Sequence, residues 1–550
     1  MSSRDSCTCQ QCAKGFTSSL LPTDAQIASI HELTRSGALP PNPSIFHASI
    51  FETTAEVLRY NAEIAKVEEE MDRLYAERRA LQSYVNGCRS VLSAFHRLPN
   101  ELLSSIFELC SPTENYRAGQ DLTEDEEVEH VSQDHLLQLA QVSSRWYHIV
   151  METPRLWSNI ALDTAVWDDC DIPETTLLSL LETSLERGQG HPLNLQLGIF
   201  CEYGHGESVL ELVSRHAHRW KNVRVVTYDF PSQQTSNRCA QFLGRLDKLE
   251  TLDLEVGWQL IQSLDAPHLS QFAFSGKFCH LPKVPWAQLR RVRYHSMHEQ
   301  DSPFSILSIL PHAHDSAKFS LRLDLRNCPT VAPSNLSVSS DIQHLAFALH
   351  TNLKDPAPVG MLFDCMTLPS LRSLICEPPA DYCTLAWPCD RFLALAHRSQ
   401  FSTHLISFSI DADVTAEDLL RCLEALPQLE KLAVKEFPCY GRLHTTVTNV
   451  LFEGLSYVSN VAPVIPNLQI LTLQSALEFA DSEYVDFVAS RVKKAHIDGK
   501  GPFRANLFWQ PESRDLLPET VEKLSELVFG GGLVFESGQI NGYGSWLGDD

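Results

Sequence analysis

The sequence has few basic residues. It contains 44 Lys and Arg against 69 Asp and Glu among 550 residues, which gives a formal net charge of -25. A surface of this sign repels the phosphates of nucleic acids and anionic lipids, so we expect neither as a partner. The sequence also lacks a run of about 18 apolar residues and the apolar stretch of a secretion signal. We therefore expect a soluble intracellular protein, in the cytosol or the nucleus, with protein partners.

The known catalytic motifs are missing as well. The sequence contains no Walker-type phosphate loop, no G-x-S-x-G elbow, no H-E-x-x-H zinc motif and no dinucleotide fingerprint. An enzyme with an unrecognised site would need convergent titratable groups in a pocket, and the sequence indicates none. We therefore predict a non-catalytic protein without a cofactor.

The 16 cysteines do not form the compact framework of a disulfide-rich domain. They are spread along the chain, and several lie within apolar runs, such as Ile375-Cys376, where a free thiol packs as a small apolar side chain. This distribution favours a reducing compartment.

The densest cysteine cluster is Cys7, Cys9 and Cys12. These three thiols would bind zinc if a fourth ligand, such as His31, came close. The alternative is three solvated thiols on a mobile tail, and we predict no metal site.

The first 94 residues divide into a leader and a long helix. Residues 1–50 mix Ser, Thr, Pro and Gly without periodicity, so we predict a disordered leader. Over residues 51–94, apolar side chains recur at alternating steps of three and four, as in a coiled coil, with Arg78 as an interruption. This helix either self-associates or packs on the next domain. Its seam consists of Val57, Tyr60, Ile64, Val67, Met71, Leu74, Leu81, Val85, Cys88 and Leu92.

Residues 95–160 contain two amphipathic helix patterns around an acidic insertion. The first pattern begins at Leu98-Pro99, because the fixed φ of proline suits the start of a helix. The insertion, residues 111–133, has too few apolar residues to fold alone. The second pattern ends at Thr153-Pro154. Its apolar face consists of Leu136, Leu139, Ala140, Ser143, Trp146 and Val150.

Together these patterns resemble the F-box. They read Leu-Pro-x-Glu-Leu-Leu-x-x-Ile-Phe at 98–107, Leu-Leu-x-Leu-x-x-Val-Ser-x-x-Trp at 136–146 and Pro-x-Leu-Trp at 154–157. Their order and closing tryptophans are similar to the F-box-like proteins abundant in mushroom-forming fungi, which often carry a coiled-coil helix before the box. The resemblance implies a three-helix module that binds the Skp adaptor, and through it a cullin, while the rest of the chain selects a substrate.

The resemblance also implies which residues contact the adaptor. An apolar face larger than the core of so small a module supports such a contact, because a partner must cover the remainder. The family usually joins its first two helices by a few residues, whereas residues 111–133 intervene here. Loop closure costs only ~0.6 kcal/mol per doubling of length, so the insertion need not prevent folding. The implied contacts are Leu98, Pro99, Leu102, Leu103, Ile106, Phe107, Val142, Ser143 and Trp146.

Beyond the box, a six-residue pattern recurs with apolar residues at its first, fourth and sixth positions. These units resemble leucine-rich repeats, in which short strands stack into a parallel sheet and helices form a second layer. Several copies follow an apolar-Pro-x-Leu lead-in, and amphipathic segments at 177–188, 207–220 and 416–426 are the expected helices. The copies are LETLDL at 249, LSQFAF at 269, LRRVRY at 289, IQHLAF at 342, LRSLIC at 371, LISFSI at 405, LEKLAV at 429 and LQILTL at 468.

The repeats are irregular in spacing. LNLQL at 193, VRVVTY at 223 and VKKAHI at 492 are candidates for further units. An irregular α/β mixture is the alternative to a regular array.

The predicted fold class is α + α/β: a long helix and a small helical F-box, followed by an irregular leucine-rich-repeat-like α/β solenoid. The predicted function is the substrate-recruiting subunit of an SCF-type cullin-RING ubiquitin ligase, which binds the Skp adaptor through the box and an unknown protein substrate through the repeats. The alternative is a non-catalytic coiled-coil scaffold that self-associates and has no ligase role. The predicted parts are the leader (1–50), the coiled-coil-like helix (51–94), the F-box (95–160), the repeat region (161–510) and a C-terminal cap and tail (511–550).

Overall fold

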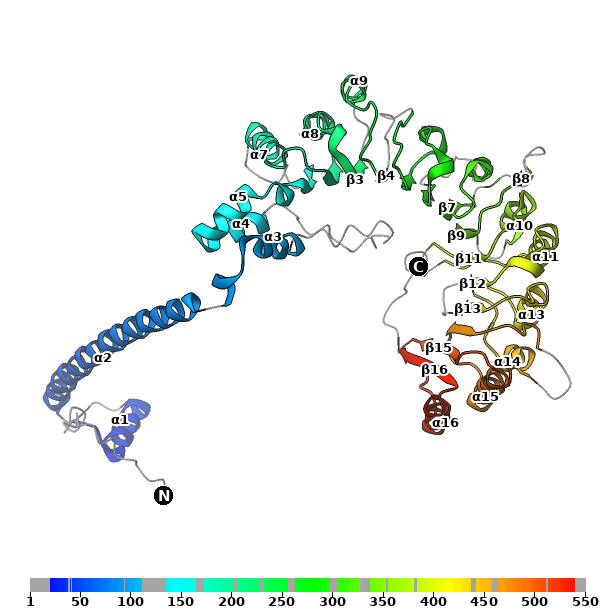
Figure 1. The fold of residues 1–550 in the computed structure, drawn as a ribbon. Coiled ribbons are helices and arrows are strands. Elements are labelled where there is room, and N and C mark those ends of the chain that lie inside the picture. Colours follow the sequence, from blue (N-terminus) through cyan, green and yellow to red (C-terminus); the bar gives the residue numbers. More distant parts are fainter. Residues whose placement is uncertain are drawn as a thin grey trace. The chain divides into compact units, whose positions relative to one another are not determined.

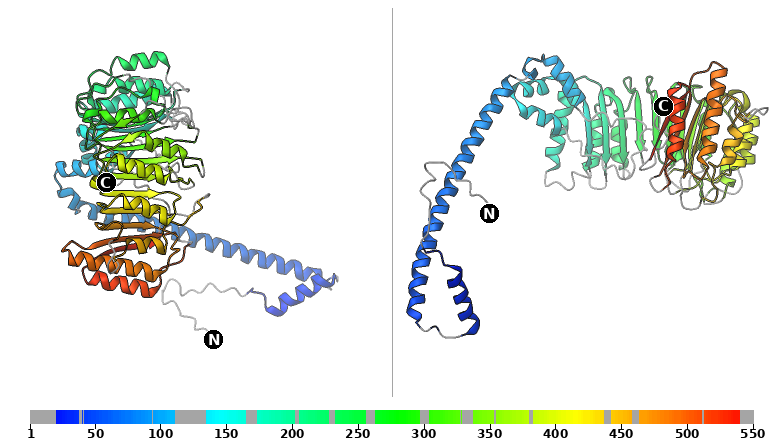
Figure 2. Two further views of the ribbon diagram at one scale, coloured as in Figure 1. Left: turned by 90° about the vertical axis from the view of Figure 1, so that its right-hand side faces the viewer. Right: turned by 90° about the horizontal axis from the view of Figure 1, so that it is seen from below.

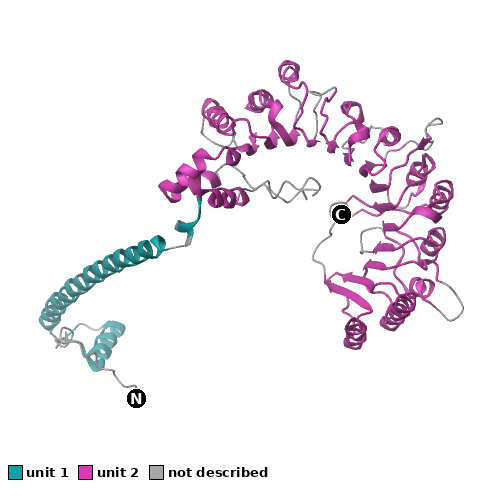
Figure 3. Ribbon diagram, in the orientation of Figure 1, with its two compact units in different colours: residues 1–99 teal, residues 100–550 magenta. Residues whose placement is uncertain are grey.

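The structure, a computed structural model, divides into two compact units, residues 1–99 and 100–550 (Figure 3). The cysteine cluster Cys7, Cys9 and Cys12 and the acidic insertion 111–133 lie outside the residues that it describes. The described residues are 20–37, 40, 42–92, 94–110, 134–164, 173–201, 205–227, 232–255, 263–296, 304–326, 328, 337–352, 355–379, 383–436, 442–457, 463–510 and 513–539.

The first unit is helical. Helix α1 (Asp24–Ser36) starts after Thr23, which forms a capping box with Gln26, and ends at Gly37, whose φ is 61°. Helix α2 (Pro43–Val91) begins with a proline, and the 3-10 helix η1 (Ala94–Arg97) follows it. The structure therefore differs from the predicted disordered leader at 24–36 and 43–50, because capping and an N-terminal proline favour helix starts in this polar segment.

Helix α2 is mostly exposed, and none of its 49 residues is buried. Its predicted apolar seam faces solvent within this chain; Ile64, for example, is 52% exposed. Surface ion pairs stabilise the helix by a few tenths of a kcal/mol each. These pairs join Glu56 to Arg59, Glu63 to Lys66, and Arg73 to both Glu70 and Glu77.

Among the described residues, the second unit starts with three short α-helices, the number that the resemblance implies. They are α3 (Asn100–Leu109), α4 (Asp134–Val142) and α5 (Ser144–Glu152), and the 3-10 helix η3 (Pro154–Ser158) follows them. The second helix pattern is thus two helices instead of one. They separate at Ser143, whose extended backbone lets its hydroxyl accept the Trp146 N–H at 3.2 Å and cap α5.

A 14-stranded parallel sheet forms the rest of the unit, and its strands pair in the order in which they occur in the sequence. Figure 1 shows the strands along the inner side of this curved unit and the helices along its outer side, and Figure 2 shows the strands side by side. The strands are β1 (Asn159–Asp163), β2 (Leu193–Ile199), β3 (Trp220–Thr227), β4 (Thr251–Glu255), β5 (Gln271–Ser275), β6 (Arg291–His295), β7 (Lys318–Asp324), β9 (His344–His350), β11 (Ser373–Glu377), β12 (Ser407–Asp411), β13 (Lys431–Lys435), β14 (Ile470–Gln474), β15 (Phe503–Trp509) and β16 (Leu533–Gln539). A separate two-stranded pair joins β8 (Val338–Ser339) to β10 (Met366–Thr367).

The helical layer includes the three predicted helices at α7, α8 and α13. Its α-helices are α7 (Glu174–Arg187), α8 (His205–Ser214), α9 (Gln233–Ala240), α10 (Ala357–Asp364), α11 (Cys389–Arg398), α12 (Phe401–His404), α13 (Ala416–Glu424), α14 (Asn449–Leu455), α15 (Asp481–Ile497) and α16 (Pro518–Phe529). Short 3-10 helices stand at η4 (Ala217–Arg219), η5 (Phe278–His280), η6 (Trp286–Gln288) and η7 (Ser305–His312).

The apolar-Pro-x-Leu lead-in is a turn that anchors a strand in the core. In the copy before β13, the Leu429 N–H donates to the Leu426 carbonyl oxygen at 3.1 Å, and both side chains are fully buried. The same turn joins Leu371 to Leu368 before β11. The leucine repeats because each turn must place two apolar side chains between the sheet and the helical layer.

All eight copies of the six-residue pattern coincide with strands, and so do LNLQL in β2 and VRVVTY in β3. The candidate VKKAHI was wrong, because it lies inside helix α15. Strands β1, β7, β15 and β16 of the large sheet and the pair β8 and β10 were not predicted, and β16 adds a pairing strand within the predicted C-terminal cap. Within the described residues, no helix is long and apolar enough to cross a membrane.

Candidate functional site

The three box helices enclose a small apolar core. Leu103 and Phe107 of α3, Leu136 of α4, and Val150 of α5 are at most 1% exposed. The Phe107 and Trp146 rings lie 4.7 Å apart between centroids and join α3 to α5. Ile149, Leu156 and Trp157 are buried as well, so the core is small and extends into η3.

Polar contacts fix how these helices pack. Arg145 of α5 donates from Nε and Nη2 to the Asn100 side-chain oxygen at 3.0 and 2.8 Å, which ties α5 to the start of α3. The Trp157 indole N–H donates to the Val150 carbonyl oxygen at 2.8 Å. The closing tryptophan of the motif is therefore a buried link between η3 and α5.

The same tryptophan joins the box to the sheet. The Arg187 guanidinium of α7 lies 4.6 Å from the Trp157 ring centroid, a cation–π distance. Strand β1 follows η3 directly and pairs with β2. From α3 onward, the box and the strand array thus share one continuous packing arrangement.

The residues predicted to contact an adaptor fall into three groups. Leu102 and Val142 are 51% and 60% exposed, and Ile106, Ser143 and Trp146 are half-buried. Leu103 and Phe107 are buried in the box core, and their role as adaptor contacts stays a prediction. An amphipathic helix pattern does not say which of its apolar residues face the module's own core. Leu98 is half-buried and Pro99 exposed, and both belong to the first unit.

Sequence reasoning missed three further exposed apolar side chains of the box. Leu109 of α3 is 78% exposed, Leu137 of α4 is 45% exposed and Tyr147 of α5 is 48% exposed. The sequence did contain a signal for these three residues, because they are large apolar residues outside the helical faces that were assigned to the core. The exposed apolar set consists of Leu102, Leu109, Leu137, Val142 and Tyr147.

The sheet offers a second accessible surface. Along β2, the side chains alternate between buried and half-buried, with Leu193, Leu195 and Leu197 toward the core. The other side chains form the strand face, which runs in register across neighbouring strands. Asn194 accepts from Asn222 at 2.8 Å and donates to Asn159 at 2.6 Å, which forms a ladder over β1 to β3.

Basic side chains gather on the strand face at β6 and β7. Arg291 pairs in register with Lys318, and His295 with Arg322. Arg293 lies 3.5 Å from Asp253 of β4. At the neighbouring β9, burial lowers the pKa of His344 and the charges of Lys318 and Arg372 lower it further, which indicates a positive local potential.

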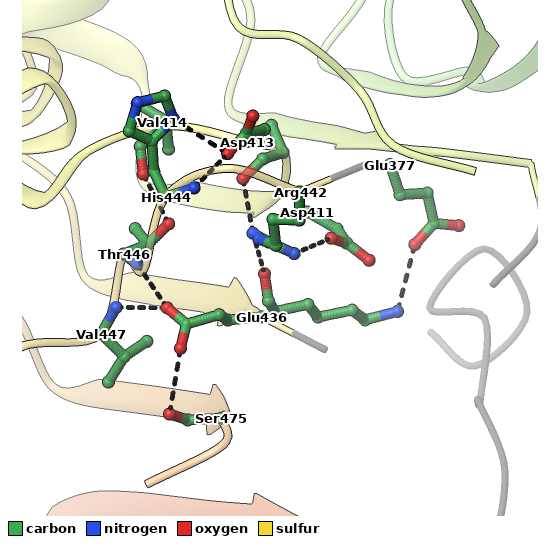
Figure 4. Close-up of polar contacts among 12 residues, drawn as sticks. Glu377, Asp411, Asp413, Val414, Glu436, Arg442, His444, Thr446, Val447 and Ser475 are labelled. Atoms are coloured by element: carbon green, nitrogen blue, oxygen red, sulfur yellow. Dashed lines mark hydrogen bonds and ion pairs between the residues drawn. The ribbon is translucent and has the colours of Figure 1, made fainter. Parts of the chain in front are cut away.

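An ion-pair network lies at the carboxyl ends of β11 to β13 (Figure 4). Lys435 and Glu377, both buried, pair at 3.2 Å. Arg442 pairs with Asp411 at 3.2 Å and donates to the Ala412 carbonyl oxygen at 2.5 Å. These contacts hold the segment after β13 against the strand ends and neutralise the buried charges.

Glu436 extends this network into the loop that leads to α14. One of its carboxylate oxygens accepts the Thr446 and Val447 N–H groups at 2.5 Å each (Figure 4). Burial nevertheless raises the pKa of Glu436 to about 7. Because backbone N–H groups already donate to its carboxylate, Glu436 is suited to a pH-sensitive structural contact and not to the role of a general base.

No group of three or more His, Cys, Asp or Glu side chains with metal-binding geometry occurs in the described part of the chain. The cysteine cluster at residues 7–12 lies outside that part.

No curated protein matches the sequence at a significant level. A family model described as F-box-like matches residues 95–163, which include α3, α4, α5, η3 and β1. Such a domain indicates in general a substrate-adaptor role in SCF ubiquitin ligases, and F-box proteins are typically non-catalytic. Residues 95–163 of this chain are thus an F-box-like domain.

Proposed function

We propose that this chain is the substrate-recruiting subunit of an SCF-type ubiquitin ligase and docks on the Skp adaptor through its box. The observation that carries the proposal is the set of large apolar side chains that the three box helices leave exposed, in a domain that matches the F-box-like family. Burying one such side chain contributes about 1.5–3 kcal/mol. Two or three of them together supply a stable helix-mediated contact.

In this proposal Leu102 and Val142 are direct contacts, and Leu109, Leu137 and Tyr147 extend the surface. Leu103, Phe107 and Trp157 act indirectly, because they hold the helices that present those side chains. The chain itself makes and breaks no bond: ubiquitin transfer to the substrate is accelerated by proximity.

We further propose that the substrate binds the strand face of the sheet through an acidic segment. The support is the position of Arg291, Lys318 and Arg322 on the same face of β6 and β7 in a protein of net charge -25. Charge complementarity favours an acidic segment over a basic one and speeds its encounter with this surface. An extended peptide that lies across strands 4.7–4.9 Å apart would meet several of these side chains.

The docking proposal is tested by capture of a purified Skp adaptor on the full-length chain. The double variant Leu102→Ala/Val142→Ala should lose capture, because it removes apolar surface without opening the box core. Leu180→Ala is the matched control, since Leu180 of α7 is an equally large side chain, 60% exposed outside the box. Unchanged capture by the double variant would overturn the docking assignment.

The scaffold alternative has its own support in α2. Its seam positions repeat every seven residues from Val57 to Leu92 and none is buried within this chain. We propose that two copies pair through this seam, because four Glu side chains beside it are already paired with basic residues on the same helix. These are Glu56, Glu63, Glu70 and Glu77.

Light scattering on the full-length chain tests this pairing. A dimer that Ile64→Lys/Leu74→Lys converts to a monomer supports it, because both substitutions place charge in the seam. A monomer at all concentrations excludes self-association. This experiment is independent of the adaptor-capture test, because Ile64 and Leu74 lie outside the box.

A further inference from the structure

Two cysteine side chains meet on the helical side of the sheet. Cys389 Sγ of α11 and Cys422 Sγ of α13 lie 3.5 Å apart, although the residues are 33 positions apart in the sequence. Both are free thiols in this structure. The two helices belong to consecutive repeats, and they flank the strands β11, β12 and β13 in the order of the sheet.

Their surroundings are unequal. Cys389 is half-buried and is the first residue of α11, where the unpaired N–H groups of a helix N-terminus stabilise negative charge. Cys422 is fully buried, and its sulfur accepts the Trp387 indole N–H at 3.5 Å. An oxidant from solvent can therefore reach Cys389 before it reaches Cys422, whose sulfur is buried 3.5 Å away.

The hydrogen bond between the two sulfurs reinforces this division. It lowers the pKa of Cys389 and raises that of Cys422. The thiolate that forms more readily is thus the accessible one. Such a pair, one exposed nucleophile and one buried neighbour, has the layout of a peroxide-sensitive dithiol.

We propose that Cys389 and Cys422 are an oxidation site that forms an intramolecular disulfide on exposure to a hydroperoxide. The site lies on the helical layer and is independent of the proposed ligase role. Its product links consecutive repeats covalently. A disulfide bond is about 2 Å long, so the sulfurs, now 3.5 Å apart, must approach by roughly 1.5 Å.

The reaction balances in two steps. The Cys389 thiolate attacks one peroxide oxygen; the O–O bond breaks, a sulfenic acid forms on Cys389 and the leaving hydroxide takes a proton to become water. The Cys422 sulfur, having lost its proton, then attacks the Cys389 sulfur. The S–S bond forms as the S–O bond breaks, and the second hydroxide takes up the proton that Cys422 released. Two thiols are oxidised and one peroxide is reduced to two waters.

Other cysteines provide the comparison. Cys376 is fully buried in β11, and desolvation raises the pKa of its thiol. Cys279 is exposed, so peroxide reaches it at least as readily as it reaches Cys389. Its modification therefore measures the reactivity of an accessible thiol outside the pair. We expect disulfide formation at Cys389 and Cys422 at lower peroxide doses than modification of Cys279.

The test is peptide mapping of the full-length protein after graded hydrogen peroxide treatment and alkylation of remaining thiols. Trypsin yields a peptide 373–391, which carries Cys376, Cys383 and Cys389, and a peptide 422–431, which carries Cys422. The expected product is these two peptides joined, two hydrogens lighter than their sum, and separated again by a thiol reductant. Cys389→Ser should abolish this product, whereas Cys383→Ser should leave it.

A second readout does not depend on fragmentation. A bridge between residues 33 positions apart should raise the melting midpoint of the oxidised protein by roughly 3–5 °C over the reduced one, and Cys389→Ser should remove that increase. The proposal is overturned if Cys279 is modified while the two peptides stay separate, or if Cys389→Ser still yields the joined peptides.

Discussion

Lys66 and Glu63 on helix α2 lie 3.2 Å apart, and so do Lys435 and Glu377 in the strand array. The first pair keeps side-chain exposures of 71% and 48%, whereas the second keeps 7% and 6%. The same contrast holds for apolar residues. No seam residue of α2 is buried, whereas Leu426 and Leu429, in the turn before β13, are both fully buried. The periodicity of apolar residues therefore determines whether a helix or a strand forms. The elements packed around it determine how much its ion pairs and apolar side chains contribute to stability.

The largest expected difference lies between the two Lys–Glu pairs. Lys435→Met should destabilise the second unit by about 3–5 kcal/mol, because it leaves the buried Glu377 charge without this partner. Lys66→Met should change stability by less than about 0.5 kcal/mol, since an exposed pair contributes little. Chemical denaturation of both variants measures the difference. Adding Glu377→Gln to Lys435→Met should recover much of the loss; no recovery would refute the charge explanation.

The apolar comparison comes next. Leu429→Ala should cost about 2–5 kcal/mol, because Leu429 is fully buried in the turn before β13. Leu74→Ala on α2, which removes the same atoms from a side chain 52% exposed, should leave the main unfolding transition in place. Equal losses in a thermal melt would mean that α2 packs on a partner surface within the folded chain.

A smaller effect concerns pH. The folded-state pKa of Glu436 is raised to about 7 from 4.5, so the folded protein binds this proton more tightly than the unfolded chain. Its stabilising contribution is fully present below pH 4.5 and is lost as pH rises through 7, by roughly 3 kcal/mol. Glu436→Gln, compared with the wild-type protein, should therefore be relatively more stable at pH 8 than at pH 5.

Exposed Glu424 on α13 offers the control for this titration. Glu424→Gln replaces an exposed carboxylate and should change stability by less than about 0.5 kcal/mol. A Glu436→Gln curve parallel to that of the wild-type protein would show that Glu436 does not titrate in this range.

The smallest effect expected is at the asparagine ladder. Asn194→Ala removes two side-chain hydrogen bonds, to Asn159 and from Asn222, and should cost about 1–2 kcal/mol. Gln196→Ala, two residues further along the same strand face, is the matched substitution. If denaturation shows equal losses for both, the ladder contributes no more than ordinary surface contacts.

The sequence predicted much of the strand array because each repeat carries its own signal. The pattern of LEKLAV at 429 predicts a strand from apolar residues that must face one side, and that strand is β13. Strand β7 escaped prediction because KFSLRLD lacks the leucine lead-in, and VKKAHI was misassigned because a short apolar pattern fits one face of helix α15 equally well.

The candidate site was predictable only in part. The motif located α3 to α5, but Leu102 and Leu103 are adjacent leucines of the same pattern, and only the packing of α3 against its neighbours, which include α5 and η3, decides that Leu103 is buried. The network of Glu377, Lys435 and Arg442 joins residues far apart in the sequence, and only the parallel register brings them together. Such contacts have no local sequence signal.

The central claim is that the exposed box residues bind an adaptor while the buried ones hold the box together. The most direct test measures, on one Leu102→Ala/Val142→Ala preparation, both its affinity for a purified Skp adaptor and its melting midpoint. We predict an affinity at least about tenfold weaker, which is roughly 1.4 kcal/mol, with a melting midpoint like that of the wild-type protein. Wild-type affinity in the double variant, or an affinity loss accompanied by an equally large loss of stability, would contradict the account.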